Sequence, residues 1–298
     1  MSMNTKFKIK GVISALLTPF ENGQVDYESL EKLVHYQMKN GINGFVVNGT
    51  TAESPTLHWS EVEEIFKRVK KVSNAQVPIL IGTGSNSTEH TISMTKKAHE
   101  LGADAALVVV PYYNKPPQRG LVQHFLAVAN CSPLPIVLYN VPGRTITSLN
   151  SESILELAQN KNIIGIKEAS GDIKFNGLLN QKLPSEFVKL SGDDGTYASY
   201  LKIGGHGIIS VMSNLIPQAC ARWTELAQIA NWAELEADFK KHEAFINGIY
   251  VEANPIVPKW MLYKMGIFKT AEMRLPMVPL DNHYHAATLQ LMKEISLV

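Results

Sequence analysis

Short apolar runs rich in β-branched residues recur along the chain, with enough residues between them for a helix. They occupy residues 11–18, 44–48, 78–84, 105–110, 135–139, 163–167, 188–191 and 207–212. Runs that are apolar at nearly every position are typical of strands buried on both faces, as in a parallel sheet. Each run is therefore predicted to form one strand of such a sheet.

Amphipathic helices are predicted between these strands. Apolar positions recur at helical spacing in three clear cases: Leu30, Leu33, Val34 and Met38; Val62, Ile65, Phe66 and Val69; and Met94, Ala98 and Leu101. Asn40-Gly41 and Gly102 follow the first and third helices as C-terminal caps, and Ser60 with Glu63 predicts a capping box for the second. Alternation of buried strands and helices over eight units predicts a closed (β/α)₈ TIM barrel, with a doubly wound open sheet as the alternative.

The strand pattern stops after residue 212, and the rest of the chain shows helical spacing alone. The apolar positions concerned are Trp223, Leu226, Ala227 and Ala230; Leu235, Phe239 and Phe245; Val257, Met261 and Leu262; and a last segment near Leu289. We expect an α/β barrel over residues 1–230 and a C-terminal helical appendage over residues 231–298.

Composition narrows the class of function. The chain has 298 residues, of which 45% are hydrophobic and 18% charged, and its net charge is +1 with the basic residues scattered. This predicts a globular protein that acts on small molecules rather than on nucleic acid or a membrane surface. Cys131 and Cys220 lie far apart, which indicates neither a disulfide framework nor a zinc site. Residues 1–10 lack a signal-peptide pattern, and no segment is apolar enough to span a bilayer, so we expect a cytoplasmic protein.

Lys167 is the first candidate for chemistry, because it ends the apolar run 163–167. Its ammonium would lose water at the end of a buried strand, which favours the neutral amine that attacks a carbonyl. Lys167 is therefore a candidate for Schiff-base formation. The alternative is a structural lysine that reaches solvent or pairs with the neighbouring Glu168.

Reactive side chains also follow the other predicted strands. They include Thr50 and Thr51, Tyr112 and Tyr113, Tyr139, and Arg144. The carboxyl ends of the strands meet at one rim of a TIM barrel, where catalytic residues lie. A phenol and a threonine hydroxyl can relay protons during imine formation, and a guanidinium can bind a carboxylate through two hydrogen bonds. Taken singly, Tyr139 could be a buried core phenol and Thr50-Thr51 a simple turn.

A metal site is not expected. His283 and His285 beside Asp281 are the one cluster of potential ligands that stands out, and they fall in the predicted helical tail, so we interpret them as structural. Glu168 alternates to the opposite face of the strand from Lys167 and is expected to make structural contacts.

Eight segments of the chain resemble the dihydrodipicolinate synthase family of pyruvate-dependent class I aldolases. They are GVISALLTPF at Gly11, NGTTAES at Asn48, GTGSNST at Gly82, PYYNKP at Pro111, LYNVPGRT at Leu138, IIGIKEASGD at Ile163, LSGDD at Leu190 and GGHGIISV at Gly204. The resemblance runs nearly end to end. Two features narrow the resemblance further: the pair Tyr112-Tyr113, and Arg144, where the related sialate-cleaving aldolases lack an arginine.

The resemblance implies a role for each matching residue. Lys167 would form an imine with pyruvate, and Tyr139, Thr50 and Tyr113 would relay protons, with Tyr113 supplied by a neighbouring subunit. Arg144 would bind the carboxylate of L-aspartate 4-semialdehyde, and the other substrate contacts would be Thr51, Ile209 and Gly192. No cofactor is implied beyond the imine itself. The family pattern implies a homotetramer built from two tight dimers.

The resemblance also implies a regulatory site for L-lysine, formed by Ser54, Asn86, His90 and Tyr112. His90 stands where lysine-sensitive relatives have a glutamate, and Val62 stands where they have a histidine, so weak inhibition or none is expected. Trp59 replaces a further histidine, a change that some sensitive relatives share. Ala52 departs from the usual glycine of the NGTTAES segment without removing a functional group.

Three other functions remain open at this point. An aldolase for a 2-keto-3-deoxy sugar acid would keep Lys167 and Tyr139 but would not need Arg144. A pyridoxal-phosphate barrel enzyme would also use a lysine imine and would absorb visible light. A catalytically silent relative would bind pyruvate without turnover, although the complete set of reactive residues argues against it.

Overall fold

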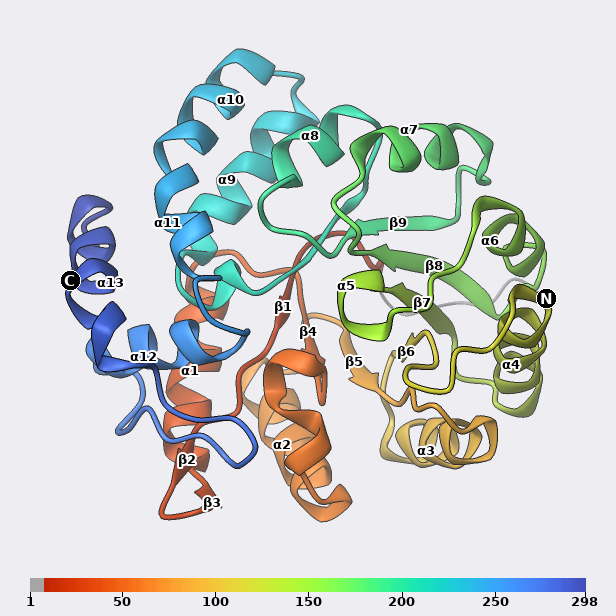
Figure 1. Ribbon diagram of the computed structural model, residues 1–298, viewed down its shortest axis with the longest axis horizontal. Coiled ribbons are helices and arrows are strands. Elements are labelled where there is room, and N and C mark those ends of the chain that lie inside the picture. The colour runs from red at the N-terminus through yellow and green to blue at the C-terminus, as the bar shows by residue number, and fades with distance from the viewer. Residues whose placement is uncertain (1–7) are drawn as a thin grey trace. The chain divides into compact units, whose positions relative to one another are not determined.

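A computed structural model of the chain describes residues 8–298 and contains a closed barrel of eight parallel strands, in the order β1-β10-β9-β8-β7-β6-β5-β4 (Figure 1). The barrel strands are β1 Gly11–Ala15, β4 Gly44–Val47, β5 Ile79–Gly82, β6 Ala105–Val109, β7 Ile136–Asn140, β8 Ile163–Glu168, β9 Val188–Ser191 and β10 Gly207–Ser210. The predicted TIM barrel is confirmed, with strand ends shifted by at most a few residues. The alternative of a doubly wound open sheet is wrong.

Contacts between Cα atoms divide the chain into two compact units. Of the described residues, unit 1 comprises residues 8–11 together with Val77–Ile209, and unit 2 comprises Val12–Gln76 and Ser210–Val298. The domain boundary expected between residues 230 and 231 stays a prediction. The expectation that residues 1–10 form no signal peptide concerns a segment that lies mostly outside the described residues. Within residues 8–298, no helix combines the length and the apolar character needed to cross a bilayer.

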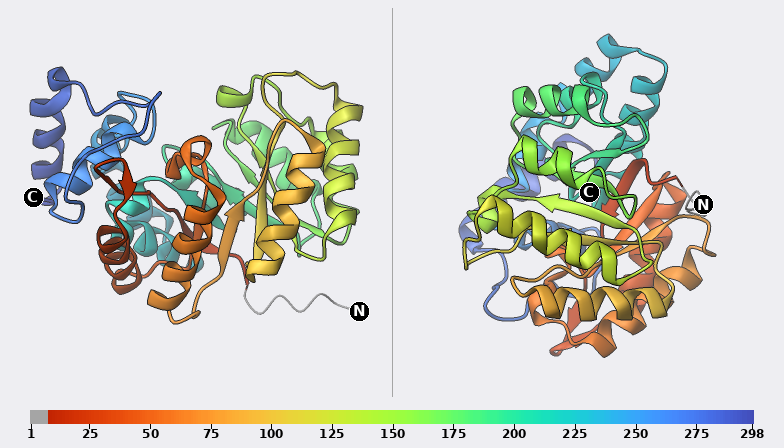
Figure 2. Two further views of the ribbon diagram at one scale, coloured as in Figure 1. Left: turned by 90° about the horizontal axis from the view of Figure 1, so that it is seen from below. Right: turned by 90° about the vertical axis from the view of Figure 1, so that its right-hand side faces the viewer.

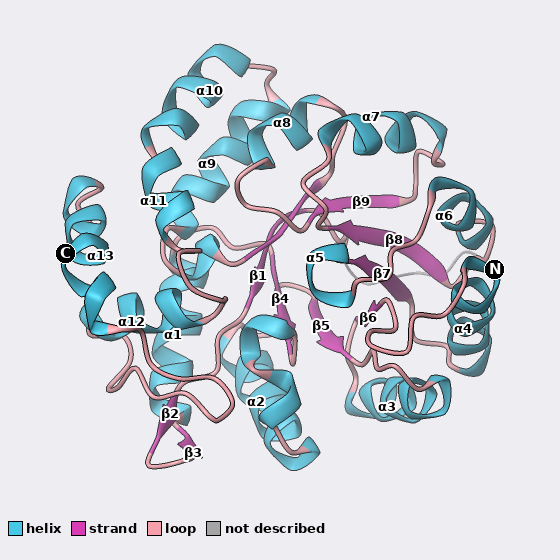
Figure 3. Cartoon of the chain, in the orientation of Figure 1, coloured by secondary structure: helices cyan, strands magenta, loops and turns pink. Residues whose placement is uncertain are grey.

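In unit 1, strands β5–β9 alternate with helices. The helices are α3 Thr88–Leu101, α4 Gln118–Cys131, α5 Pro142–Thr145, α6 Ser151–Leu157, α7 Ile173–Lys182 and α8 Tyr197–Lys202. Figure 3 shows α3, α4, α6 and α7 on the outer side of the strands. The strands are buried at nearly every position because helices cover this side, as expected for a parallel sheet.

Helices α3 and α4 lie side by side (Figure 2). The buried face of α3 is formed by Thr91, Thr95 and Ala98, so the predicted face with Met94 is wrong in part. A threonine can be buried here because its hydroxyl is hydrogen-bonded: Thr95 Oγ1 donates to the Thr91 carbonyl oxygen at 2.8 Å and contacts Thr83 Oγ1 at 2.9 Å.

Helix α4 contributes a buried histidine to this contact. His124 is 5% exposed, and its Nδ1 lies 2.9 Å from the hydroxyl oxygen of Thr88 in α3. Burial lowers the pKa of His124 to about 4, so the imidazole is neutral in the folded protein at neutral pH.

Unit 2 consists of β1 and β4, a two-stranded hairpin and the remaining helices. The elements are hairpin strands β2 Phe20–Glu21 and β3 Gln24–Val25, helices α1 Tyr27–Lys39, α2 Trp59–Val72, α9 Pro217–Gln228, α10 Trp232–Lys241, α11 Glu243–Gly248, α12 Ile256–Lys264 and α13 Asn282–Glu294, and 3₁₀ turns η1 Thr50–Ala52, η2 Ser54–Thr56 and η3 Met212–Asn214. The C-terminal helices are as predicted. The hairpin was missed, although Asn22-Gly23 with positive φ at both residues is the usual two-residue hairpin turn.

The start of α2 differs from the sequence prediction. The N-terminal cap is His58, whose backbone N–H donates to Glu61 Oε2 at 2.9 Å, so the capping box expected at Ser60 and Glu63 is wrong. Glu63 instead accepts a hydrogen bond from the Trp59 indole at 2.6 Å. The buried face of α2, with Val62, Ile65, Phe66 and Val69, is confirmed.

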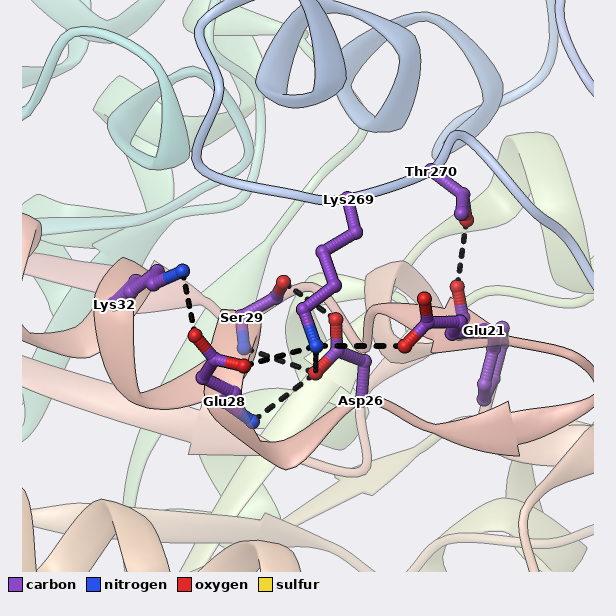
Figure 4. Close-up of polar contacts among 8 residues, drawn as sticks. Glu21, Asp26, Glu28, Ser29, Lys32, Lys269 and Thr270 are labelled. Carbon is purple, nitrogen blue, oxygen red and sulfur yellow. Dashed lines mark hydrogen bonds and ion pairs between the residues drawn. The ribbon is translucent and has the colours of Figure 1, made fainter.

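A segment that follows α12, residues 269–274, binds the β2–β3 hairpin and is called the strap below. The Lys269 ammonium lies 2.9 Å from Glu28 Oε2 and 3.4 Å from both Glu21 Oε2 and Asp26 Oδ1 (Figure 4). Thr270 Oγ1 donates to the backbone oxygen of Phe20 at 2.7 Å. Burial opposes ionisation of Asp26, but hydrogen bonds from Ser29 and the Lys269 charge hold the pKa of that carboxyl below its ordinary value.

The buried imidazole of His124 predicts a specific acid sensitivity. Its pKa is lower in the folded than in the unfolded chain, so the unfolded state binds more protons between pH 6.5 and about 4, and stability falls as the pH falls through this window. From about pH 7 to about pH 5 we expect His124 to remove about 2 kcal/mol of unfolding free energy. His124→Gln should lose this part of the pH dependence in urea unfolding. If the stability of the unmodified protein and of His124→Gln depended on pH in the same way, His124 would not be the source of the acid sensitivity.

Candidate active site

The pairing of β7 with β8 places Tyr139 beside Lys167. The two strands run parallel with Ile136 opposite Ile163 but Val137 opposite Gly165, so the register shifts by one residue at Ile164. Beyond this bulge Tyr139 lies opposite Lys167, and side chains that are opposite each other in a sheet share a face. The bulge therefore sets which residue of β7 faces the lysine.

The Lys167 side chain is buried against the phenol ring. Lys167 is 6% exposed and Tyr139 7%, and the ammonium nitrogen lies 4.2 Å from the ring centroid. Contact with the face of an aromatic ring stabilises a cation without a hydrogen bond. The structural alternative in which Lys167 reaches solvent is wrong.

Gly192 leaves room for this lysine. A Cβ atom at position 192 would lie 2.7 Å from Lys167 Cε and 2.6 Å from Ala169 Cβ, closer than real carbon atoms approach. Gly192 follows β9 directly, and its N–H donates to the Glu168 carbonyl oxygen at 2.7 Å. The structure thus gives Gly192 a steric role beside Lys167. Ile209, the other expected substrate contact of unit 1, lies in β10 and is 1% exposed.

Glu168 makes structural contacts rather than an ion pair with Lys167. Its carboxylate is 1% exposed and accepts hydrogen bonds from Asn140 Nδ2 at 2.6 Å and from the Ser170 N–H at 2.7 Å. Burial raises the pKa of Glu168, although these two hydrogen bonds oppose the shift. Asn140 Oδ1 in turn accepts from the Leu149 N–H at 3.0 Å. Glu168 therefore fastens the segments that follow β7 and β8, the structural role that the sequence predicted.

Arg144 lies in the short helix α5, directly after β7, and its side chain is exposed. The turn that carries it is fixed by hydrogen bonds: the Arg144 N–H donates to the Val141 carbonyl at 2.9 Å, and Thr145 Oγ1 bonds to the same carbonyl at 3.0 Å. Ile146 follows with φ of 64°, which is rare for a β-branched residue. Such backbone strain persists where surrounding contacts fix the conformation, and it is frequent at functional sites.

The loop after β6 that carries Tyr112 and Tyr113 also has a strained backbone, and both tyrosine side chains are exposed. Tyr113 has φ of 74° and is 85% exposed, while Tyr112 is 40% exposed. Asn114 Nδ2 donates to the Asn86 carbonyl oxygen at 2.8 Å, which ties this loop to the segment before α3. His90 lies in the first turn of α3, where its N–H donates to Ser87, and its side chain is exposed. Asn86, His90 and Tyr112 of the predicted lysine site thus all belong to unit 1.

Residues 48–56 of unit 2, called the threonine loop below, carry Thr50, Thr51 and Ser54 in two successive 3₁₀ turns. Thr51 is 3% exposed, and its hydroxyl oxygen accepts a hydrogen bond from Asn254 Nδ2 at 3.0 Å. Ala52 is buried in the first turn and does not have the positive φ that would call for glycine. The departure from the family pattern at Ala52 therefore fits the loop without strain.

Three residues of this region were not predicted from the sequence: Glu53, Asn254 and Lys259. Glu53 and Lys259 form an ion pair in which the side chains are 1% and 0% exposed. The sequence did contain a signal for a buried lysine at position 259, because Lys259 lies inside the apolar run 256–262, much as Lys167 lies at the end of the run 163–167. The sequence does not show which distant carboxylate receives such a lysine.

The histidines near the C-terminus have structural contacts. Asp281 caps helix α13 by accepting the His283 N–H at 2.8 Å, and the His285 ring stacks on Trp260 with centroids 4.8 Å apart. Across residues 8–298, no group of three or more His, Cys, Asp or Glu side chains is placed to hold a metal ion.

Known proteins resemble the chain over nearly its whole length. The profile of the dihydrodipicolinate synthetase family matches residues 8–295. The chain is 50% identical over 289 residues to the 4-hydroxy-tetrahydrodipicolinate synthase of Bdellovibrio bacteriovorus, covering 97% of this chain and 99% of the relative.

Two solved structures are similar as well. The dihydrodipicolinate synthase of Acinetobacter baumannii, complexed with pyruvate, superposes with a TM-score of 0.95 at 40% identity, covering 98% of this chain and all of that one. The enzyme of Cyanidioschyzon merolae with lysine bound gives 0.93 at 38% identity, over 97% and 99% of the two chains. With this coverage and these identities, the chain belongs to the dihydrodipicolinate synthetase family.

Proposed function

We propose that the protein is a 4-hydroxy-tetrahydrodipicolinate synthase, a lyase that condenses pyruvate with L-aspartate 4-semialdehyde in the diaminopimelate route to L-lysine. The observation that carries this assignment is the buried amine of Lys167, held 4.2 Å from the Tyr139 ring centroid at the end of β8. The synthase name of the relatives and the pyruvate bound to the Acinetobacter baumannii enzyme support it. A biosynthetic enzyme of this kind would act in the cytoplasm.

The first half of the reaction forms an imine with pyruvate. The neutral amine of Lys167 attacks C2 of pyruvate, and the resulting carbinolamine loses water to give the imine. These steps need proton transfers beside the amine, which Tyr139, Thr50 and Tyr113 would relay. Thr51, Gly192 and Ile209 would seat the pyruvate carboxylate. The protonated imine draws electrons from C3, so the proposed reaction needs no further cofactor.

The second half joins the two substrates. Loss of a proton from C3 gives an enamine, which adds to the aldehyde carbon of the semialdehyde while the aldehyde oxygen takes a proton. The amine of the semialdehyde then displaces Lys167 from the imine carbon, which closes the ring and frees the lysine. Arg144 would bind the carboxylate of the semialdehyde, because an exposed guanidinium on a fixed turn can form two parallel hydrogen bonds with it.

Tyr113 would complete the proton relay in a neighbouring subunit. Its side chain is 85% exposed and its backbone is in the left-handed region, an unfavourable combination for a large aromatic residue that has no partner surface. A homotetramer of two tight dimers would provide that surface. The alternative activity, cleavage of a 2-keto-3-deoxy sugar acid, is not favoured, because it gives Arg144 no role and the relatives carry the synthase name.

Trapping with borohydride tests the proposed imine. Borohydride added together with pyruvate should inactivate the protein irreversibly and leave a reduced pyruvyl group on Lys167, since borohydride reduces an imine to a stable amine. Peptide mass mapping locates the group, and Lys167→Met is the control that should take no label. An adduct on another lysine, or inactivation that does not require pyruvate, would overturn the mechanism.

Arg144→Ala should separate the two substrates. We expect the variant to form the pyruvate imine normally but to lose about 10- to 100-fold in kcat/KM for the semialdehyde, the loss of a charge-assisted contact of about 1.5–3 kcal/mol. Arg119→Ala, which removes an exposed guanidinium from α4, should leave both substrates unaffected and serves as the control. Equal weakening of imine formation by Arg144→Ala would count against the assignment.

Inhibition by L-lysine should be weak or absent. The exposed His90 would offer a neutral or repelling group to the amino group of the ligand, where a carboxylate would attract it. Titration of lysine into a coupled assay measures this, and His90→Glu should increase the affinity for lysine at least about tenfold. Strong inhibition of the unmodified protein at submillimolar lysine would show that the site functions despite the substitutions.

A further inference from the structure

We propose that Glu53 and Lys259 are positioning residues, whose buried ion pair holds the threonine loop in the shape that Thr50 and Thr51 need to act on pyruvate. This inference rests on the proposed function and extends it to two residues outside the expected catalytic set. The contacts that carry it all lie within unit 2.

Glu53 occupies the strained point of the threonine loop. Its backbone is left-handed, with φ of 57° and ψ of 40°, between the two 3₁₀ turns. The Glu53 N–H donates to the Thr50 carbonyl oxygen at 3.1 Å, and its own carbonyl accepts the Thr56 N–H at 2.8 Å. A non-glycine residue keeps this conformation only when its surroundings hold it there. Release of Glu53 would therefore change the turn that contains Thr50 and Thr51.

The Glu53 side chain provides that restraint. Its carboxylate is buried, with Oε1 bonded to the Lys259 ammonium and Oε2 accepting the Arg274 N–H at 3.0 Å. The Lys259 ammonium also donates to the Glu272 carbonyl oxygen at 3.0 Å and lies 4.2 Å from the centroid of the Phe20 ring. Burial lowers the pKa of Lys259 to about 8, although Glu53 opposes the shift. Each partner is thus costly to bury without the other.

A fully buried ion pair contributes little net stability. The desolvation of both charges offsets most of their attraction, and replacement of both by neutral groups of similar volume is often neutral or stabilising. Removal of one partner alone is strongly destabilising, because the other charge stays buried. Net stabilisation of the fold is therefore a weak explanation for the presence of the Glu53–Lys259 pair. The fixed direction and length of the contact suit a role in positioning instead.

The segment that leads into α12 holds the loop at a second point. Asn254 lies just before α12, the helix that carries Lys259, and its side-chain amide donates to Thr51 Oγ1 at 3.0 Å. One stretch of chain thus restrains both the Thr51 hydroxyl and the Glu53 carboxylate. This arrangement fixes the threonine side chain and the loop backbone together.

The strap holds the far end of the loop. Arg274 Nη1 donates to the Thr56 carbonyl oxygen at 2.9 Å, and its guanidinium binds Glu61 through two hydrogen bonds of 2.6 and 2.8 Å. The guanidinium carbon also lies 4.4 Å from the centroid of the Phe20 ring, which Lys259 contacts as well. The hydrogen bond from Arg274 lowers the pKa of Glu61, so this pair stays charged at neutral pH. Lys259, Arg274 and the Phe20 ring therefore form one connected set of contacts that holds the threonine loop from Glu53 to Thr56.

Steady-state kinetics of four variants tests the proposal: Glu53→Gln, Lys259→Met, the double variant, and Lys269→Met as control. The control removes another ammonium that ties the strap to the hairpin, without a contact to the threonine loop. Each protein is assayed well below its own unfolding temperature. We expect Lys259→Met and Glu53→Gln to raise the KM for pyruvate at least tenfold and to lower kcat, with an unchanged KM for the semialdehyde. Lys269→Met should keep the kinetics of the unmodified protein even where its unfolding temperature falls.

The double variant separates positioning from stability. It buries no unpaired charge, so its unfolding temperature should recover relative to Lys259→Met, while the KM for pyruvate stays high because the loop has lost its tether. Recovery of normal kinetics in the double variant would overturn the proposal, as would normal kinetics in a folded single variant or an equal kinetic loss in Lys269→Met. If Lys259→Met does not fold, Glu53→Gln and the double variant decide the question. Absence of a pyruvate imine in the unmodified protein would instead overturn the proposed function itself.

Discussion

The parallel register of β7 and β8 is the constraint on which the candidate site depends. Side chains alternate between the two faces of a strand, so a slip of one residue would turn Lys167 to the other face and bring Glu168 into its place. The register shift at Ile164 sets this alignment, because without it Tyr139 would lie opposite Ile166. Gly192 after β9 completes the arrangement by leaving space for the lysine side chain. The nucleophile, its phenol neighbour and the space around them thus follow from backbone pairing.

The protein buries charged side chains in distinct ways, and each way suits a different role. Lys259 is held by a carboxylate and a carbonyl oxygen, so its ammonium is a fixed structural charge. Glu168 is held by an amide and a backbone N–H, which fasten two loops. Lys167 is buried against the face of a phenol ring, a contact that a neutral amine can leave at small cost. These contacts make Lys167 a better nucleophile than Lys259.

The sequence predicted much of this structure because buried parallel strands have an apolar pattern that few other elements share. All eight barrel strands and Lys167 at the end of its run followed from that pattern. The buried face of α3 did not, since Thr91 and Thr95 are polar and become suitable for burial through hydrogen bonds that spacing does not show. The pairing of Glu53 with Lys259 was also beyond the sequence pattern, because the two residues lie 206 positions apart. The strand bulge at Ile164 did have a signal in the sequence, because Gly165 follows it and a glycine inside a strand often marks a bulge.

A crystal structure of the assembled protein with pyruvate tests the central claim most directly, namely that Lys167 is the nucleophile and acts together with the threonine loop. The account predicts continuous electron density from Lys167 Nζ to C2 of pyruvate, with the carboxylate of the ligand bound at Thr51, and with Tyr139 and Thr50 beside the imine. Pyruvate bound without a covalent bond to Lys167, or an imine on Lys259, would contradict it.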